Sequence, residues 1–416
     1  MITTPEVLAP VGDKERLISA LDYGADAVYL GSKQFTMRAA PANFTGDELK
    51  EAVDLAHSKG VKVYLTCNTL PRNNELSQFG EFLNNALTAN VDAVITADLG
   101  LLSLIKSAAP DLEVHMSTQT GIVNYATANM LYNMGVKRVV LARELSLDEI
   151  AEIRAKTPKD LEIEVFVHGA MCVSFSGRCL LSAYLTDRDA NRGACAQPCR
   201  WKYHLMEETR EGQYFPVIEN DTGTYILNAK DLCMIDYIPE LVKAGVTSLK
   251  IEGRAKSAYY VSVITNAYRC AVDAWRNSPN KDNFVLPEWI RNEVFQVSHR
   301  EYCTGFFFGH PKNCQRYADN NYVKYSDVVA MVDYWKDGRL YITQRNRFFA
   351  DDILEGLIAG KEPVKINLGG RIWDENGELV EVANHAMMKY SIPCETPMPP
   401  RTFIRRRASA GSSPNI

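Results

Sequence analysis

The feature that most constrains the fold is an alternation of short apolar runs and amphipathic stretches over residues 1 to about 255 of 416. The runs are almost continuously apolar, which is typical of parallel strands buried on both faces. Eight of them occupy residues 6–9, 25–30, 61–66, 93–96, 112–115, 138–141, 163–167 and 248–251. With helical patterns between them, they predict an α/β fold, a TIM-type (β/α)8 barrel. The alternative is an open doubly wound sheet, but no Gly-x-Gly-x-x-Gly follows the first run, which disfavours its dinucleotide-binding form.

Helix signals lie between most of the apolar runs. Amphipathic patterns predict helices at residues 47–58, 75–89, 127–134, 146–156 and 258–277. Thr45 with Glu48, and Ser146 with Glu149, have the spacing of a capping box, in which side chains at the start of a helix bond its first backbone N–H groups. These signals support the alternation of strand and helix that a barrel requires.

The spacing of the strands is regular up to the seventh and is then interrupted. About 80 residues, from His168 to Gly245, separate the seventh run from the eighth, and an insertion of this length in a compact domain is usually functional. We therefore expect a barrel domain at 1–280 that includes a cysteine-containing insertion at 168–245, and a helical connector at 281–323. Short runs with turn sequences predict a small C-terminal antiparallel β-barrel at 324–407, and a polar, disordered tail at 408–416.

Composition is that of an ordinary globular protein. Hydrophobic residues make up 46% of the chain, charged residues 23%, and the formal net charge is −5. No apolar run approaches the ~20 residues of a membrane span, and the N-terminus lacks the pattern of an export signal. We therefore expect a cytoplasmic protein with no membrane partner. The acidic balance gives no global indication of a nucleic-acid partner.

The positions of the cysteines are more informative than their number. Of ten cysteines, Cys172, Cys179, Cys195 and Cys199 fall in one short stretch. In a reducing compartment such a group indicates a metal or redox site more often than disulfides. Structural zinc prefers pairs with about two to four residues between ligands, and the wider first pair favours an iron–sulfur cluster over zinc. Cys233 is a further candidate, although its apolar neighbours indicate an inward position on a helix.

Polar residues follow most of the predicted strands. In a (β/α)8 barrel the C-terminal strand ends and the loops after them form the active site. Arginines 38, 143 and 254 would meet at this end, which indicates an anionic ligand. The full set is Tyr29, Arg38, Asn68, Asp98, Ser117, Gln119, Arg143, Glu144, His168, Glu252 and Arg254. Asp98 and Ser117 are expected to be structural.

Two other classes of function remain open on these residues. Cys172 lies near His168, as a thiol nucleophile and its base would, but the chain has neither His-Glu-x-x-His nor Gly-x-Ser-x-Gly. Basic and aromatic residues around the cysteines suit RNA with splayed bases, and a second basic stretch spans 401–407. The first group is Arg178, Arg188, Arg192, Arg200, Trp201, Lys202 and Tyr203.

Several motifs resemble those of the collagenase-like peptidases of unassigned mechanism, peptidase family U32. Residues 164–182, Glu-Val-Phe-Val-His-Gly-Ala-Met-Cys-Val-Ser-Phe-Ser-Gly-Arg-Cys-Leu-Leu-Ser, look like the family's signature. Leu-Ala-Pro-Val-Gly at 8–12 and Lys-Ile-Glu-Gly-Arg at 250–254 are similar to further family motifs. Asp-Arg-Asp at 187–189 and Gly-x-Cys-x-x-x-Cys-Arg-Trp at 193–201 resemble the branch that hydroxylates tRNA.

The resemblance implies prephenate-dependent hydroxylation of the wobble uridine of tRNA to 5-hydroxyuridine, by an enzyme with a four-cysteine iron–sulfur cluster (4Fe-4S). The implied ligands are Cys172, Cys179, Cys195 and Cys199, with Cys233 as the substitute for Cys199. The implied partners are tRNA and a small anionic co-substrate. Prephenate is a dicarboxylate, and it suits the arginine-lined mouth expected above.

Roles at the strand ends are inferred from position alone. His168, Asn68 and Glu252 are expected to take part in catalysis. The co-substrate is expected to bind at Tyr29, Arg38, Gln119, Arg143 and Arg254. Collagenase-like peptide hydrolysis is the alternative function, and an RNA-binding scaffold without catalysis is a weaker third.

Overall fold

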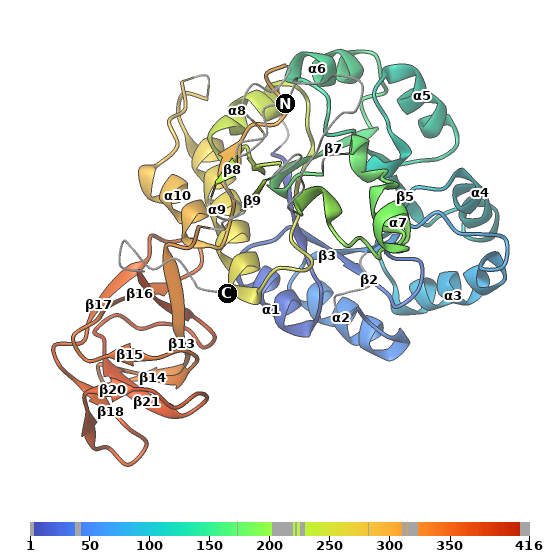
Figure 1. Cartoon of the computed structure of the whole chain (residues 1–416). Coiled ribbons are helices and arrows are strands. Elements are labelled where there is room, and N and C mark those ends of the chain that lie inside the picture. Colours follow the sequence, from blue (N-terminus) through green and yellow to red (C-terminus); the bar gives the residue numbers. More distant parts are fainter. Residues whose placement is uncertain are drawn as a thin grey trace.

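The computed structural model describes residues 4–37, 43–172, 174–201, 219–220, 223–224, 229–281, 283–309, 314 and 323–407. Within them, eight parallel strands form a closed barrel (Figure 1). Closure comes from β11, which pairs in parallel with β1 on one side and with β7 on the other. The strands are β1 (Glu6–Pro10), β2 (Ala27–Gly31), β3 (Lys62–Cys67), β4 (Ala93–Thr96), β5 (Glu113–Met116), β6 (Arg138–Val140), β7 (Glu162–Ala170) and β11 (Ser248–Ile251). The predicted (β/α)8 barrel is confirmed.

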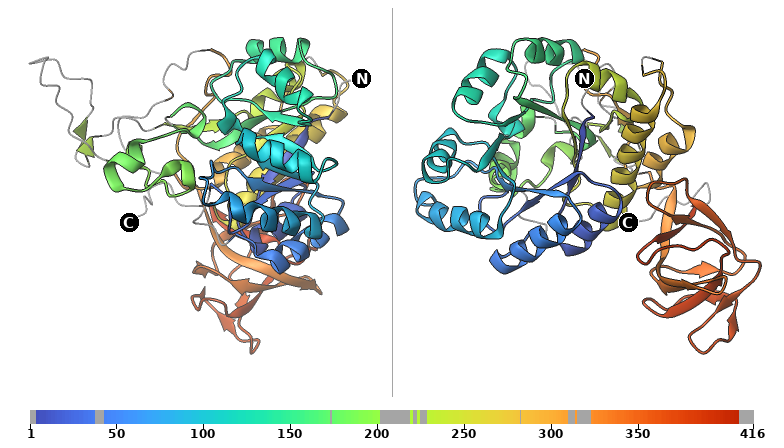
Figure 2. Two further views of the ribbon diagram at one scale, coloured as in Figure 1. Left: turned by 90° about the vertical axis from the view of Figure 1, so that its right-hand side faces the viewer. Right: turned by 180° about the vertical axis from the view of Figure 1, so that it is seen from behind.

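Helices cover the outside of the barrel (Figure 2). They are α1 (Lys14–Asp22), α2 (Gly46–Ser58), α3 (Phe79–Ala89), α4 (Leu99–Ala108), α5 (Tyr125–Asn133), α6 (Leu147–Ala155), α8 (Ile238–Lys243) and α9 (Ala258–Asn277). Thr45 and Glu48 form the predicted capping box at α2, and Ser146 and Glu149 form the one at α6. Among the described helices, none combines the length and the apolar character needed to cross a membrane.

The interior of the barrel contains an ion-pair network towards the N-terminal ends of the strands. Arg138 on β6 pairs with Glu6 at 2.7 Å and with Glu164 at 3.0 Å, and Lys250 on β11 pairs with Glu164 at 2.6 Å. Burial alone would raise the pKa of Glu164. The positive charges of Lys250 and Arg138 outweigh burial and lower this pKa to about 2. Removing one partner of a buried ion pair of this kind is strongly destabilising. Arg138 and Lys250 are neutralised by carboxylates of the chain itself.

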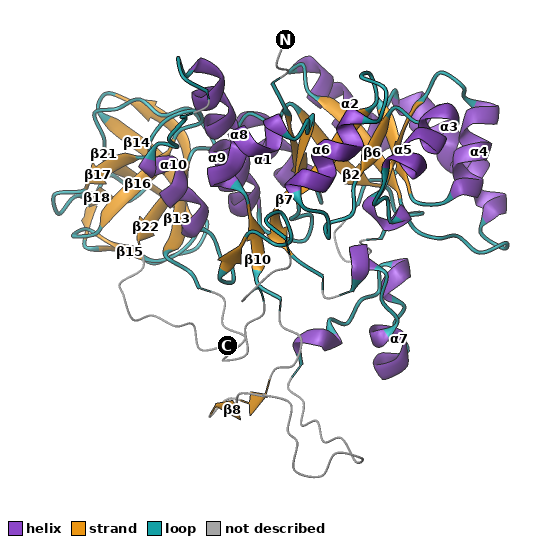
Figure 3. Cartoon of the chain, turned by 90° about the horizontal axis from the view of Figure 1, so that it is seen from above, coloured by secondary structure: helices purple, strands orange, loops and turns teal. Residues whose placement is uncertain are grey.

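Strand β7 extends past the barrel and carries the insertion. Its last residues pair antiparallel with β10 (Asp231–Cys233), which pairs with β12 (Tyr302–Cys303). Asp231 lies opposite Ala170, so the segment between them begins and ends at one point of the sheet. That segment includes 3-10 turns and α7 (Leu181–Thr186), which stands away from the barrel (Figure 3). The pattern did not predict β10 and β12, because strands of two or three residues show no periodicity.

The C-terminal domain is an antiparallel sheet that curls on itself (Figure 1), as predicted. Within residues 323–407 the strand order is β17-β16-β22-β13-β14-β21-β18-β19, around a separate apolar core. These strands are β13 (Ser326–Lys336), β14 (Arg339–Gln344), β16 (Ile353–Leu357), β17 (Val364–Asn367), β18 (Ile372–Trp373), β19 (Leu379–Val380), β21 (Lys389–Pro393) and β22 (Phe403–Arg407). The connector before it contains α10 (Glu288–Glu293) as well as β12.

A buried ion cluster joins the two domains and changes the interpretation of the basic stretch at 401–407. Arg405 is fully buried and pairs with Glu293 of α10 at 2.6 Å and with Glu355 of β16 at 2.8 Å. Arg407 also pairs with Glu355, at 2.8 Å. Arg405 is not available to contact RNA, because its guanidinium is bound by carboxylates inside the protein.

Candidate active site at the barrel mouth

The C-terminal ends of the barrel strands form a mouth in which Arg254 is fixed. Arg254 follows β11, is 2% exposed, and donates to the hydroxyls of Thr36 at 2.9 Å and Thr66 at 3.3 Å, and to the amide oxygen of Asn43. Each of these three bonds ends on a neutral oxygen, and together they orient the guanidinium. Gly31 provides the space, because a Cβ there would lie 2.2 Å from Nη2 of Arg254.

Arg143 and Glu144 connect the end of β6 to the cysteine-bearing segment. The Arg143 guanidinium lies 3.9 Å from the ring centroid of Phe166, and Nη1 donates to the carbonyl oxygen of Ala170 at 3.1 Å. The Glu144 carboxylate accepts bonds from the backbone N–H and the hydroxyl of Ser176, both at 2.7 Å. The insertion is therefore attached to the mouth at a second point besides β7.

Gln119 lies in the turn after β5 and presents an unsatisfied oxygen. Its backbone carbonyl accepts a bond from Nε of Arg178 at 2.6 Å, and its side chain is buried. Within the described residues, Oε1 of Gln119 has no hydrogen-bond partner. A buried amide oxygen without a donor costs about 1–3 kcal/mol, so a water molecule or a ligand donor is expected at this position.

Three of the polar residues expected at the strand ends bond the local backbone. Asp98 accepts a bond from the N–H of Leu101 at the start of α4, and Ser117 accepts one in the turn after β5. These two are structural, as expected. Asn68 accepts a bond from the N–H of Met37 at 3.3 Å and so supports the loop after β2.

Tyr29 and Arg38 were both expected to bind the co-substrate. Tyr29 is buried inside the barrel, where its hydroxyl donates to the carbonyl oxygen of Ile251 at 2.9 Å. Nζ of Lys250 lies 4.5 Å from the centre of its ring. Tyr29 therefore forms part of the wall beneath the mouth. Arg38 lies outside the described residues.

His168 is buried against tyrosine side chains. The hydroxyl of Tyr268 lies 3.5 Å from Nδ1, and that of Tyr302 lies 3.3 Å from Nε2. Burial, together with the nearby charges of His299 and Lys256, lowers the pKa of His168 to about 3, so its ring is neutral. This environment is typical of a residue that positions others, and a direct catalytic role for His168 stays a prediction.

Glu252 follows β11 at a point where its backbone comes very close to the backbone of Gly169. Its N–H donates to the carbonyl of His168 at 2.9 Å, and its own carbonyl accepts a bond from the Tyr260 hydroxyl at 3.0 Å. Gly169 has a φ of 105°, and a Cβ there would lie 2.5 Å from the Glu252 carbonyl oxygen. Only glycine satisfies both conditions. The backbone of Glu252 is therefore fixed, and its carboxylate remains a candidate at the mouth.

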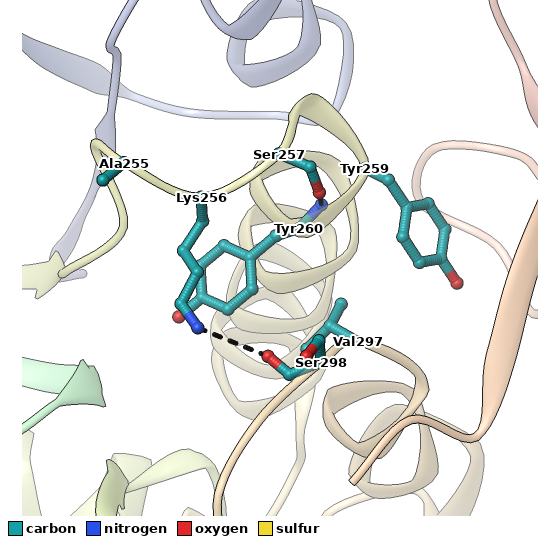
Figure 4. Close-up of a pocket in the computed structure, with 7 residues that line it drawn as sticks. All are labelled: Ala255, Lys256, Ser257, Tyr259, Tyr260, Val297 and Ser298. Atoms are coloured by element: carbon teal, nitrogen blue, oxygen red, sulfur yellow. Dashed lines mark hydrogen bonds between the residues drawn. The ribbon is translucent and has the colours of Figure 1, made fainter. Parts of the chain in front are cut away.

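A cavity of about 330 Å³ opens at the loop that follows Arg254 (Figure 4). Its lining includes Lys256, Tyr260 and, from the connector, Ser298. Nζ of Lys256 donates to the carbonyl of Ser298 at 3.4 Å and lies 5.4 Å from the centre of the Tyr260 ring. Small-molecule sites have volumes of roughly 300–1,000 Å³, so the cavity is large enough for a small ligand.

The sequence pattern did not indicate the residues that bond Arg254, nor the cation Lys256 that lines the cavity. Thr36 and Asn43 lie in the loop after β2, and Lys256 lies two residues beyond the Glu-Gly-Arg motif. Their position after strand ends was a usable signal, because every such loop in a barrel borders the mouth.

The four clustered cysteines all lie on the segment after β7. Cys172 and Cys195 are exposed, and Cys179 and Cys199 are half-buried. Asn191 holds the backbone of Cys179 through bonds of 3.2 and 2.9 Å. The residue types fit an iron–sulfur cluster or another thiophilic metal. Within the described residues, however, no group of three or more His, Cys, Asp or Glu side chains is close enough to hold a metal ion.

Cys233, the substitute ligand, lies close to the base of this segment. It is on β10, opposite His168, and Cys172 follows the C-terminal end of the same strand β7. Desolvation raises the pKa of the Cys233 thiol to about 12, which opposes the thiolate form that metals require. The choice between Cys199 and Cys233 as the fourth ligand stays a prediction.

Comparison with known proteins identifies the family. The model of peptidase family U32 matches residues 12–316, and the model of the U32 C-terminal domain matches residues 324–405. The chain belongs to peptidase family U32. The matches cover both the barrel with its mouth and the curled sheet.

Relatives within family U32 have names of two kinds. The chain is 36% identical over 406 residues to tRNA hydroxylation protein P1 of Bacillus subtilis, covering 97% of this chain and 94% of the relative. It is 35% identical over 394 residues to tRNA hydroxylation protein P of Escherichia coli, covering 84% and 85%. An uncharacterized protease of Methanocaldococcus jannaschii is 47% identical over 311 residues, 74% of each chain. This U32 protein is thus a homologue of tRNA hydroxylation proteins.

Proposed function

We propose that this U32 protein is a tRNA-modifying enzyme that hydroxylates the wobble uridine to 5-hydroxyuridine, with prephenate as co-substrate. The observation that carries the proposal is the 36% identity to tRNA hydroxylation protein P1, which extends over 97% of the chain. A similarity of this length includes the barrel mouth, the cysteine-bearing segment and the C-terminal domain together. The polar mouth supports the proposal, because it offers several side chains that suit a small anion and a base.

The co-substrate is proposed to bind in the mouth beside Arg254. A guanidinium held by bonds to hydroxyl and amide oxygens is pre-oriented for bidentate contact with a carboxylate. The buried Oε1 of Gln119 is suited to accept a bond from the hydroxyl of such a ligand. Arg143, fixed on the ring of Phe166, and Arg38 in the loop after β2 are proposed to contribute further positive charge.

The cofactor is proposed to be a 4Fe-4S cluster held by Cys172, Cys179, Cys195 and Cys199. Such a cluster supplies electron-transfer chemistry when bound. The location of all four cysteines on one segment at the mouth supports the assignment. The segment is proposed to draw these side chains together when it takes up the cluster.

Residues of the barrel are proposed to present the uridine to this site. Glu252 follows β11 and Asn68 follows β3, and both carry groups able to bond a uracil edge. His168 bonds Glu252 through its backbone carbonyl and has a neutral, buried ring. We therefore assign His168 to positioning the Glu252 loop.

Nucleoside analysis of tRNA tests the proposal. A strain that lacks this protein, and any second gene of the same family, should have tRNA without 5-hydroxyuridine, and the wild-type gene should restore it. Protein purified without oxygen should contain iron and sulfide in stoichiometric amounts. Unchanged tRNA in the deletion strain would contradict the hydroxylation, and zinc in place of iron would contradict the cluster.

Peptide hydrolysis is a second candidate, favoured by the 47% identity to a relative named as a protease. Its simplest form, with Cys172 as nucleophile and His168 as base, is opposed by geometry. Both ring nitrogens of His168 face tyrosine hydroxyls, and the ring is 1% exposed, whereas Cys172 is exposed. Cleavage of collagen-like peptides by metal-free protein, abolished by Cys172→Ala, would establish this candidate instead.

A further inference from the structure

Large apolar side chains are exposed on the cysteine-bearing segment. Tyr184 on α7 is 81% exposed, and Leu180, directly before this helix, is 59% exposed. Phe175 and Trp201, on the same segment, are 49% and 42% exposed. We call these four residues the aromatic patch. Exposed apolar groups that gather in this way mark interaction sites more often than scattered single residues do.

Local contacts place the members of the aromatic patch near one another and near the mouth. Leu180 and Tyr184 are four residues apart, and the N–H of Tyr184 donates to the carbonyl of Leu180 at 3.0 Å, so they share one helical face. Trp201 directly follows a 3-10 turn that packs against α7. Phe175 lies next to Ser176, which Glu144 bonds at the end of β6. The patch therefore extends from the mouth outwards along α7.

Charge separates the segment from the rest of the chain. Residues 171–201 contain four arginines and two aspartates, whereas the whole chain has a net charge of −5. A segment whose sequence joins aromatic residues with a surplus of arginine is complementary to single-stranded nucleic acid, whose bases stack and whose phosphates are anionic. A second copy of this acidic chain would also attract positive charge, but it offers no unpaired bases on which exposed rings could stack.

We propose that the aromatic patch stacks unpaired bases of an RNA loop and so presents one neighbouring base to the barrel mouth. This inference rests on the proposed function, because it gives the tRNA substrate a binding surface. Tyr184 is the central member, since its ring is almost fully available and it has Leu180 beside it on the same face. Stacking needs an aromatic ring and tolerates the loss of the hydroxyl.

Binding of an anticodon stem-loop RNA to the full-length protein tests the patch. The probe is a fluorescent hairpin with an unmodified wobble uridine, titrated at fixed salt with wild type, Tyr184→Phe, Tyr184→Leu and Tyr184→Ala. We expect Phe to preserve the dissociation constant, and Leu and Ala to raise it about 5- to 100-fold. Tyr334→Ala is the matched control, because Tyr334 is 49% exposed on β13 of the C-terminal domain. All variants should keep the wild-type melting temperature.

The outcomes separate this inference from the proposed function. Equal affinity of all Tyr184 variants, or an equal loss with Tyr334→Ala, would overturn the stacking surface whatever the tRNA analysis shows. Affinity kept by Leu but lost with Ala would indicate an apolar contact without stacking, and would also overturn it. If sedimentation shows a dimer that Tyr184→Ala dissociates, the patch is an interface between copies. If binding behaves as expected but the deletion strain retains 5-hydroxyuridine, the proposed function fails and the surface stands.

Discussion

The two ends of the barrel surround their buried cations with different groups. Near the N-terminal strand ends, Arg138 and Lys250 are paired with Glu6 and Glu164 at 2.6 to 3.0 Å. At the C-terminal mouth, the bonds that position Arg254 end on hydroxyl and amide oxygens. Both ends bury cations: carboxylates of the chain bind Arg138 and Lys250, whereas two hydroxyls and an amide oxygen orient Arg254.

This difference distinguishes a charge that stabilises the fold from one that is suited to a ligand. A cation enclosed by carboxylates cannot attract an anionic substrate, because its field is cancelled at short range. Bonds to neutral oxygens restrict the rotation of a guanidinium but do not cancel its electric field. The comparison predicts that substitutions at the N-terminal end change stability, and that substitutions at the mouth change function.

The largest effect on function is expected at Cys179, in the cysteine-bearing segment at the C-terminal mouth of the barrel. Cys179→Ala should remove the iron of anaerobically purified protein and abolish 5-hydroxyuridine formation in a complemented deletion strain, since a cluster that loses a ligand is not retained. Cys270→Ala, which removes a buried thiol from α9, is the control and should retain both. Comparing Cys199→Ala with Cys233→Ala identifies the fourth ligand. Full iron content in the Cys179 variant would refute the ligand assignment.

The largest effect on stability is expected at the opposite end. Arg138→Met removes the cation that the carboxylates of Glu6 and Glu164 share, and should lower the free energy of unfolding by about 3–5 kcal/mol. Lys14→Met is the control, because the pair Lys14–Glu51 is exposed and should change the value by less than about 1 kcal/mol. Urea unfolding followed by circular dichroism measures both. Equal effects of the two substitutions would show that the interior network does not stabilise the barrel.

A smaller, purely functional effect is expected at Arg254. Arg254→Lys keeps the charge but loses the bidentate geometry, and should raise the KM for prephenate about 10- to 100-fold with little change in iron content. Arg371→Lys on the C-terminal domain is the control. Turnover of undermodified tRNA at varied prephenate concentration provides the measurement. An unchanged KM would show that Arg254 does not bind the co-substrate, and would contradict the proposed functional difference between the two ends of the barrel.

The smallest effect concerns the pH dependence of stability. His168 has a folded pKa of about 3, well below its ordinary value of 6.5, so below pH 6.5 the unfolded chain binds a proton that the folded protein does not. Its contribution to stability is present above pH 6.5 and is lost as the pH falls towards 3. His168→Gln should therefore reduce the slope of unfolding free energy against pH by about 1.4 kcal/mol per unit between pH 6 and 4. The exposed His385→Gln should leave the slope unchanged, and identical slopes for the two variants would contradict the burial of His168.

Much of the fold was predictable from periodicity and capping. The eight apolar runs correspond to β1 to β7 and β11, and both expected capping boxes are present. These features are local, because a strand buried on both faces and a capped helix leave their pattern within a few residues. The short strands β10 and β12 leave no such pattern, since their pairing with the end of β7 depends on contacts distant in sequence.

The site was predictable in its location and less so in its roles. Position at a strand end correctly placed Arg143, Arg254 and Glu252 at the mouth. The same criterion could not distinguish them from Tyr29, whose side chain points into the barrel beneath them. The basic stretch 401–407 illustrates the same limit, because charge in the sequence does not reveal the carboxylates that Arg405 meets in the fold. Burial and pairing are properties of the tertiary structure, and composition alone does not determine them.

The pairing of Asp231 with Ala170 has a consequence for how the protein matures. Because the cysteine-bearing segment leaves and rejoins the sheet at one residue pair, the barrel completes its ring of backbone bonds without any contribution from that segment. Folding of the barrel and ordering of this segment can then be separate events, in that order. The same arrangement makes the segment exchangeable over evolutionary time, since its length and chemistry can change without altering the register of a single barrel strand.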